Sequence, residues 1–119
     1  MSADLRYLYR LNVLKGSGRK AAVPGYMVGG KTGTAQKVVN GRYSNTARLN
    51  SFLAAFPIDD PQYVVLVMLD DPQRAKDGGG TTAGWNTAPT AGAVIRRSAA
   101  LLGVEPRKDV GVNTLLVSN

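Results

Sequence analysis

The stretch GYMVGGKTGTAQKVVNG, residues 25–41, decides the fold, because it fits two motifs that require different secondary structures. Read from Gly25, it matches the phosphate loop G-x-x-x-x-G-K-[ST], in which a helix begins near the lysine and its N–H groups bind phosphate. Read from Lys31, it is a Lys-Thr-Gly triplet on a β-strand. The first interpretation predicts a nucleotide-binding protein and the second a serine acyltransferase.

The surrounding residues disfavour the phosphate loop. Residues 17–24 form no convincing strand before the motif. A helix starting at Lys31 would carry Gly33 in its first turn and have room for only about two and a half turns before Asn40-Gly41. Asn-Gly is instead typical of the tight turn in a β-hairpin. We therefore expect a strand ending near Val39, with nucleotide binding as a remaining alternative.

The composition narrows the chemistry further. With 119 residues, 44% hydrophobic and 19% charged, the chain suits one ordered domain, residues 1–119. Cysteine and histidine are both absent, which excludes disulfides, a Ser-His-Asp triad and His- or Cys-bearing metal sites. We expect no cofactor and no metal. The net charge of +7 is dispersed along the chain rather than clustered, so we expect no nucleic-acid partner.

The patterning predicts an α+β fold, in which helices pack on a three-stranded antiparallel sheet. Leucines at positions 5, 8, 11 and 14 indicate an amphipathic helix over residues 4–14 with Asp4 as its cap, and small and apolar residues indicate a second helix over residues 87–102. Strands are expected near residues 26–39, 49–56 and 62–69. The last of these is apolar without alternation, which favours a strand covered on both faces and central in its sheet. The tail after residue 104 is expected to be irregular or a short extra strand.

On a strand, Lys31 and Gly33 would point to one face, and Thr32 and Thr34 to the other. Such an edge suits an extended peptide: the lysine supplies positive charge, threonine hydroxyls bind a carboxylate, and a backbone N–H stabilises an oxyanion. An isolated triplet is a weak signal, since a surface hairpin with a solvated lysine has the same sequence.

The context of the triplet is more specific. The segments GSGRKAAVPGYMVGGKTGTAQK, NSFLAAFP, YVVLVMLDDP and TAPTAGAVIRR, in that order, closely resemble the C-terminal part of the transpeptidase domain of class B penicillin-binding proteins, division or septal type. The resemblance implies a fragment of the penicillin-binding-protein/β-lactamase transpeptidase fold. In that fold the sheet has five strands, and the last strand here pairs with one from the missing N-terminal half.

The resemblance also implies site roles. Lys31, Thr32 and Gly33 match the third active-site motif of the family, so Lys31 would help to bind the terminal carboxylate of a stem peptide or a β-lactam and tune nearby serine hydroxyls. The hydroxyl of Thr34 would contact that carboxylate, and its backbone N–H would form one arm of the oxyanion hole. The Thr32 side chain is expected to point away from the cleft. Trp85 is a candidate contact at the rim, with plain packing as the alternative.

The family's nucleophile motif Ser-x-x-Lys and its Ser-x-Asn motif lie upstream of such a segment. We interpret Ser17-Gly18-Arg19-Lys20 as a coincidental match in a glycine-flanked loop. The chain is therefore expected to be part of a serine-type D,D-transpeptidase and to be inactive by itself, with a non-catalytic peptide-binding module as the alternative.

The resemblance implies where the parent protein acts and what it meets. The parent would be anchored in the inner membrane, with this domain in the periplasm, and would meet divisome proteins, while the fragment itself would be soluble. The parent reaction is attack by a serine on a D-Ala-D-Ala amide, followed by transfer of the acyl group to an amine of neighbouring peptidoglycan. In the isolated chain, the apolar strand over residues 62–69 would leave an exposed edge and favour self-association.

Overall fold

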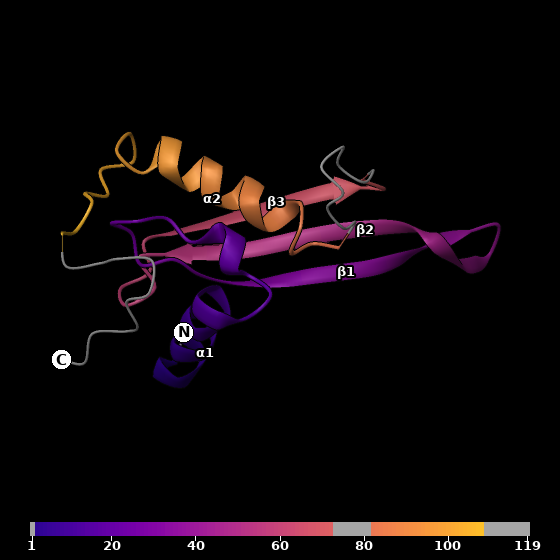
Figure 1. The fold of residues 1–119 in the computed structure, drawn as a ribbon, viewed down its shortest axis with the longest axis horizontal. Coiled ribbons are helices and arrows are strands. Elements are labelled where there is room, and N and C mark those ends of the chain that lie inside the picture. The colour runs from indigo at the N-terminus through magenta and orange to yellow at the C-terminus, as the bar shows by residue number, and fades with distance from the viewer. Residues whose placement is uncertain (1, 73–81, 109–119) are drawn as a thin grey trace.

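A computed structural model describes residues 2–72 and 82–108, apart from the side chains of residues 44–46. The described chain has an α+β fold (Figure 1). Its elements in chain order are α1 (Ala3–Lys15), the 3₁₀ helix η1 (Arg19–Ala21), β1 (Gly29–Val39), β2 (Arg42–Phe56), β3 (Tyr63–Asp70) and α2 (Thr87–Ser98). The expected α+β class with a three-stranded sheet is confirmed. The tail after residue 108 lies outside the described residues.

The sheet is antiparallel, with the strand order β1-β2-β3. Asn40 and Gly41 both have positive φ, 53° and 78°, as the tight turn between β1 and β2 requires. β1 runs unbroken through Lys31, which pairs with Leu53 of β2. No helix begins at Lys31, so the phosphate-loop interpretation is wrong.

The main core lies between α2 and one face of the sheet. Phe52 and Phe56 of β2 are fully buried there, together with Ala91 and Ile95 of α2. The Asn86 side chain caps α2 by accepting a hydrogen bond from the Thr87 N–H at 2.6 Å. The helix ends at Ser98, and turns follow it, so it is shorter than the expected 87–102.

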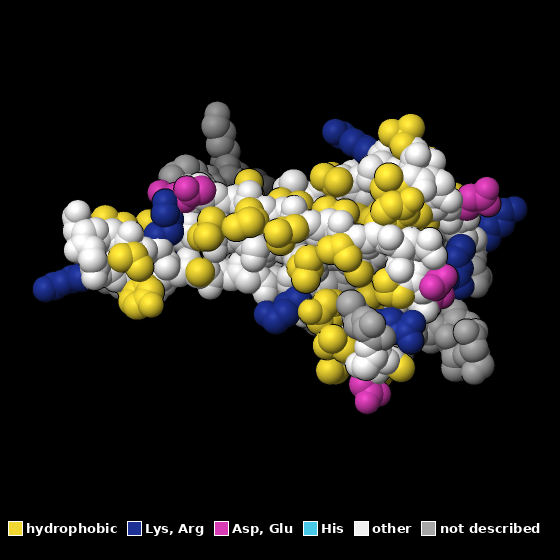
Figure 2. All heavy atoms as spheres, turned by 180° about the vertical axis from the view of Figure 1, so that it is seen from behind, with side chains coloured by type: hydrophobic (Ala, Val, Ile, Leu, Met, Phe, Trp, Pro, Cys, Tyr) yellow, Lys and Arg dark blue, Asp and Glu magenta, His cyan; other side chains and the backbone are white. Residues whose placement is uncertain are grey.

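The expectation that the third strand is central is wrong for the described chain. β3 lies at the sheet edge, and its residues alternate between partly buried and exposed positions. Val64, Leu66 and Met68 are 64, 58 and 55% exposed on the face turned away from α2. Apolar side chains gather over the middle of the molecule in the view of Figure 2. The unalternating pattern therefore reflects one buried and one exposed apolar face within this chain.

Helix α1 lies beside β1 (Figure 1). Its cap and its buried face differ from those expected from the sequence. Its N-cap is Ser2, whose Oγ accepts a hydrogen bond from the Leu5 N–H at 3.2 Å, and not Asp4. The buried residues of α1 are Arg10 and Val13, whereas Leu5 and Leu8 are 41 and 57% exposed. Leu11 and Leu14 are partly buried, so the leucine stripe is exposed only in the N-terminal half of α1.

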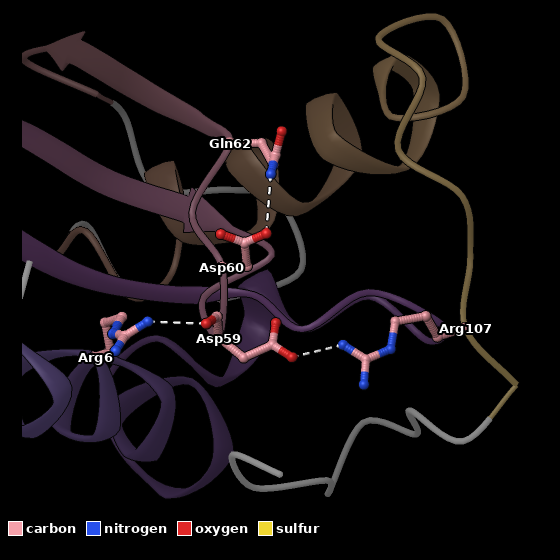
Figure 3. Close-up of polar contacts among 5 residues, drawn as sticks. All are labelled: Arg6, Asp59, Asp60, Gln62 and Arg107. Carbon is pink, nitrogen blue, oxygen red and sulfur yellow. Dashed lines mark hydrogen bonds and ion pairs between the residues drawn. The ribbon is translucent and has the colours of Figure 1, made fainter. Parts of the chain in front are cut away.

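Polar contacts attach α1 to the rest of the chain (Figure 3). Arg6 donates to the Asp59 backbone oxygen at 2.8 Å, and Arg107 forms an ion pair with the Asp59 carboxylate at 2.7 Å. The fully buried Arg10 donates to the Val28 carbonyl at 2.8 Å. Burial lowers the pKa of Arg10 to about 10, with the nearby Asp59 acting in the opposite direction. Asp59 therefore links α1, the β2–β3 connection and the segment after α2.

Candidate functional site

A pocket of about 410 Å³ lies along β1 on the sheet face that α2 covers. It is where the glycine-rich segment after α1, the first half of β1 and the residues just before α2 meet. Its described lining consists of Gly16, Ser17, Arg19, Lys20, Thr32, Thr34, Thr82, Gly84 and Trp85. Because β1 is the edge strand of the described sheet, the pocket opens beside a strand edge that an extended peptide could pair with.

The hydroxyl of Thr34 is held by the backbone before α2. Its Oγ1 accepts a hydrogen bond from the Ala83 N–H at 3.1 Å. A hydroxyl has one proton to donate, and this contact does not use it. The Thr34 proton therefore remains free for a ligand in the pocket.

The hydroxyl of Thr32 is held by Ser17, which belongs to the segment that follows α1. Its Oγ1 lies 2.9 Å from Ser17 Oγ, with either oxygen able to donate. Ser17 is in turn held by Asn12, whose Oδ1 accepts from the Ser17 N–H at 3.2 Å and whose Nδ2 donates to the Gly30 carbonyl at 2.9 Å. The Ser17 hydroxyl donates its one proton to Asn12 Oδ1 at 3.3 Å, so Thr32 is the donor to Ser17 Oγ. Thr34 is therefore the hydroxyl whose proton is free for a ligand in the pocket.

The charge of the pocket is positive. Arg19 and Lys20 line it, and none of the described lining residues is acidic. The Lys20 ammonium lies 4.8 Å from the centre of the Trp85 ring, within the range of a cation–π contact. Trp85 is 54% exposed, so it forms part of the pocket wall and is not a core residue. Positive charge beside a free hydroxyl donor is suited to binding a carboxylate.

Lys31 and Gly33 lie on the other face of β1. The Lys31 ammonium donates to the Thr32 carbonyl at 3.1 Å, and Lys31 lines a neighbouring pocket beside α1 that shares Ser17 and Thr32 with the first one. A Cβ on Gly33 would come within 2.6 Å of Ser51 Oγ, so a larger residue here would displace the Ser51 hydroxyl. The sequence correctly predicted that side chains alternate between the two faces of β1. It could not predict that Thr32 and Thr34, and not Lys31 and Gly33, line this pocket.

Of the predicted site residues, the structure brings Thr32, Thr34 and Trp85 together. Thr32 was expected to point away from the cleft; in the structure it lines the same pocket as Thr34. Ser17 and Lys20, which also line the pocket, were not among the predicted site residues. Their signal was the Ser-x-x-Lys string itself, set aside because it was judged only as a nucleophile motif. Within residues 2–72 and 82–108, no three metal-binding side chains cluster.

Comparison with known proteins identifies the family. Residues 2–91 match the model of the penicillin-binding protein transpeptidase domain. The chain therefore belongs to the penicillin-binding protein transpeptidase domain family.

Curated relatives carry division and sporulation names. The chain is 46% identical over 108 residues to stage V sporulation protein D of Bacillus subtilis, covering 91% of this chain and 16% of that protein. It is 44% identical over 119 residues to the probable peptidoglycan D,D-transpeptidase FtsI of Caulobacter vibrioides, covering 92% of this chain and 20% of the relative. The chain thus spans about a fifth or less of the length of these relatives.

Solved structures agree with this assignment. Penicillin-binding protein 3 of Mycobacterium tuberculosis in complex with ampicillin superimposes with a TM-score of 0.74 at 31% identity, covering 96% of this chain and 26% of that chain. The transpeptidase domain of penicillin-binding protein 3 from Burkholderia pseudomallei superimposes with a TM-score of 0.73 at 35% identity, covering 87% of this chain and 30% of that chain.

Among the described helices, none has the length and apolar character needed to cross a membrane.

Proposed function

We propose that this chain is the peptide-binding part of a peptidoglycan D,D-transpeptidase, and that the pocket beside β1 binds the terminal carboxylate of a stem peptide or of a β-lactam. The observation that carries the proposal is the pair of hydroxyls of Thr32 and Thr34. The Thr34 oxygen accepts from the Ala83 N–H, which leaves the Thr34 proton for an anion. The Thr32 hydroxyl donates to Ser17 in the free chain and turns to the anion when it gives up that partner. The pocket around them is positively charged.

The remaining site roles in this proposal are those that the resemblance to the family implies. The backbone N–H of Thr34 forms one arm of the oxyanion hole, beside the carboxylate that its hydroxyl holds. Lys31, on the opposite face, acts on the serine hydroxyls contributed by the rest of the domain. Trp85 packs against the bound peptide at the rim of the pocket, where it is half exposed.

The whole protein would cross-link stem peptides through a serine acyl-enzyme, with the nucleophile on the part of the domain that precedes this segment. It would be anchored in the inner membrane, act in the periplasm and meet divisome proteins. The chain alone binds its ligand reversibly and transfers no acyl group. A peptide-binding module without catalysis predicts the same binding for the isolated chain, so the two differ only in the whole protein.

Binding of a peptide acid and its amide tests the carboxylate site. We expect acetyl-D-Ala-D-Ala to shift the NMR signals of Thr32 and Thr34 at lower concentration than the same peptide with a C-terminal amide. Thr34→Val removes one donor and should abolish the preference for the acid. Thr90→Val is the matched control, because the Thr90 hydroxyl is exposed and donates within α2 to the Asn86 carbonyl. Equal binding of acid and amide by the unmodified chain would contradict the proposal.

Incubation with ampicillin, followed by mass spectrometry of the intact chain, tests the absence of catalysis. Ser17 Oγ contacts Asn12 and Thr32 oxygens, and the Lys20 ammonium lies over Trp85. We therefore expect no increase in mass. An adduct with the mass of the intact β-lactam on Ser17 would show that the Ser-x-x-Lys string is a nucleophile motif after all.

A further inference from the structure

The pocket contains a positive charge that the Lys-Thr-Gly motif does not supply. A carboxylate leaving water for a pocket is stabilised most by a charged donor. The Lys31 ammonium contacts the Thr32 carbonyl, and Lys31 lines the neighbouring pocket, which shares Ser17 and Thr32 with this one. The described cations that line the pocket are Arg19 and Lys20, both from the segment that precedes the strand.

The backbone of Lys20 is fixed against α2. Ala21, the next residue, is fully buried, and η1 packs on α2 at Gly92. A Cβ on Gly92 would lie 3.2 Å from both the Lys20 carbonyl oxygen and the Ala21 Cα, so glycine permits this close approach. The hydrogen bond between Ser17 and Thr32 joins the start of the same segment to β1. Lys20 thus starts from a defined position relative to the two threonines.

The side chain of Lys20 is also directed. Its ammonium lies 4.8 Å from the centre of the Trp85 ring, and Trp85 lines the pocket. An exposed cation–π contact is weaker than a charge-assisted hydrogen bond to a carboxylate. The ammonium can therefore leave the ring for a bound anion at small cost. Arg19 also lines the pocket but has no comparable aromatic contact among the described interactions.

We propose that Lys20 is the counter-ion of the bound carboxylate, and thus a residue that determines specificity for peptides with a free terminal acid. This inference rests on the proposed function of the pocket. Thr32 and Thr34 orient the two carboxylate oxygens, Lys20 neutralises their charge, and Trp85 holds the ammonium near the pocket before the ligand arrives.

The fluorescence of Trp85 provides the test, since it is the only tryptophan of the chain and contacts the proposed counter-ion. Acetyl-D-Ala-D-Ala and its C-terminal amide are titrated separately into the chain. Lys20→Gln should weaken binding of the acid about tenfold and leave binding of the amide unchanged. Lys20→Arg, which keeps the charge, should restore much of the preference for the acid. Arg97→Gln, the same loss of charge at an exposed position on α2, should change both affinities less than about twofold because the charge is distant and screened.

The outcomes separate this inference from the function on which it rests. If the unmodified chain prefers the acid and Lys20→Gln retains that preference, Lys20 is not the counter-ion and the carboxylate site stands. Loss of the preference in Lys31→Gln, with Lys20→Gln unaffected, would assign the charge to Lys31 and overturn the inference in the same way. If the unmodified chain binds acid and amide equally, the carboxylate site itself fails and the role of Lys20 fails with it. Circular dichroism of each variant shows that a loss of binding is not a loss of fold.

Discussion

Helices α1 and α2 both carry apolar residues at helical spacing, but only α2 buries its apolar stripe. Ala91 and Ile95 of α2 are fully buried against the sheet. In α1 the buried positions are Arg10 and Val13, while Leu8 is 57% exposed. The two faces of the sheet differ in the same way: one packs against α2, and the other exposes apolar side chains of β3. One side of the molecule is therefore held by apolar burial, and α1 is held largely by polar contacts.

Truncating one apolar residue on each helix tests this difference most directly. Ile95→Ala removes a fully buried side chain and should lower the free energy of unfolding by about 2–4 kcal/mol. Leu8→Ala, on the exposed stripe of α1, should change it by less than about 0.5 kcal/mol. Urea unfolding followed by circular dichroism measures both. A similar loss in the two variants would mean that the leucine stripe is buried in solution.

Removing Asp59 tests the polar attachment of α1. Asp59→Ala leaves the buried Arg10 without its nearby negative charge and breaks the ion pair with Arg107. Because the Asp59 side chain is 23% exposed, we expect a moderate loss of about 1–3 kcal/mol. Hydrogen exchange should accelerate in α1 more than in α2.

The matched control for that variant is Asp60→Ala. The Asp60 carboxylate accepts only an exposed hydrogen bond from the Gln62 side chain in the described structure, at 3.1 Å (Figure 3). Its removal should leave both stability and exchange nearly unchanged. If the two variants behaved alike, the contacts of Asp59 would not be what attaches α1.

Local signals in the sequence predicted more of this molecule than periodicity did. The β1–β2 turn was predictable because Asn40-Gly41 accepts positive φ at both positions. The leucine spacing of α1 gave a helix but not its orientation, because burial depends on what packs against it. Alternation separated Lys31 from Thr32 but could not assign the pocket to either face. The contact between Lys20 and Trp85 joins segments distant in the chain, and no local pattern indicates it.

The exposed face of β3 predicts self-association of the isolated chain. Two copies that pack these apolar sheet faces together would remove Val64, Leu66 and Met68 from water. Leu66→Lys should weaken this association about tenfold, since it replaces buried apolar area with a charge. Val94→Lys, at a 41% exposed position on α2, is the matched control and should have no effect. A monomer mass that does not change with concentration in sedimentation would contradict the prediction.

The smallest effect is expected from an ion pair at the surface, which contrasts with the buried contacts of Arg10. Lys37 of β1 lies 2.6 Å from the Asp70 carboxylate of β3, and the hydrogen bond between them raises the pKa of Lys37 above 10.5. Because the pKa is higher in the folded than in the unfolded chain, the contribution to stability is fully present below the unfolded value. It is lost as the pH rises through the folded value.

The difference in free energy of unfolding between the unmodified chain and Lys37→Gln should therefore be small and constant near neutral pH, and vanish in strongly alkaline buffer. Lys108→Gln, the same charge change at an exposed position, should show no such pH dependence. A difference that persisted above the raised pKa would mean that the Lys37 side chain stabilises β1 by packing rather than by charge.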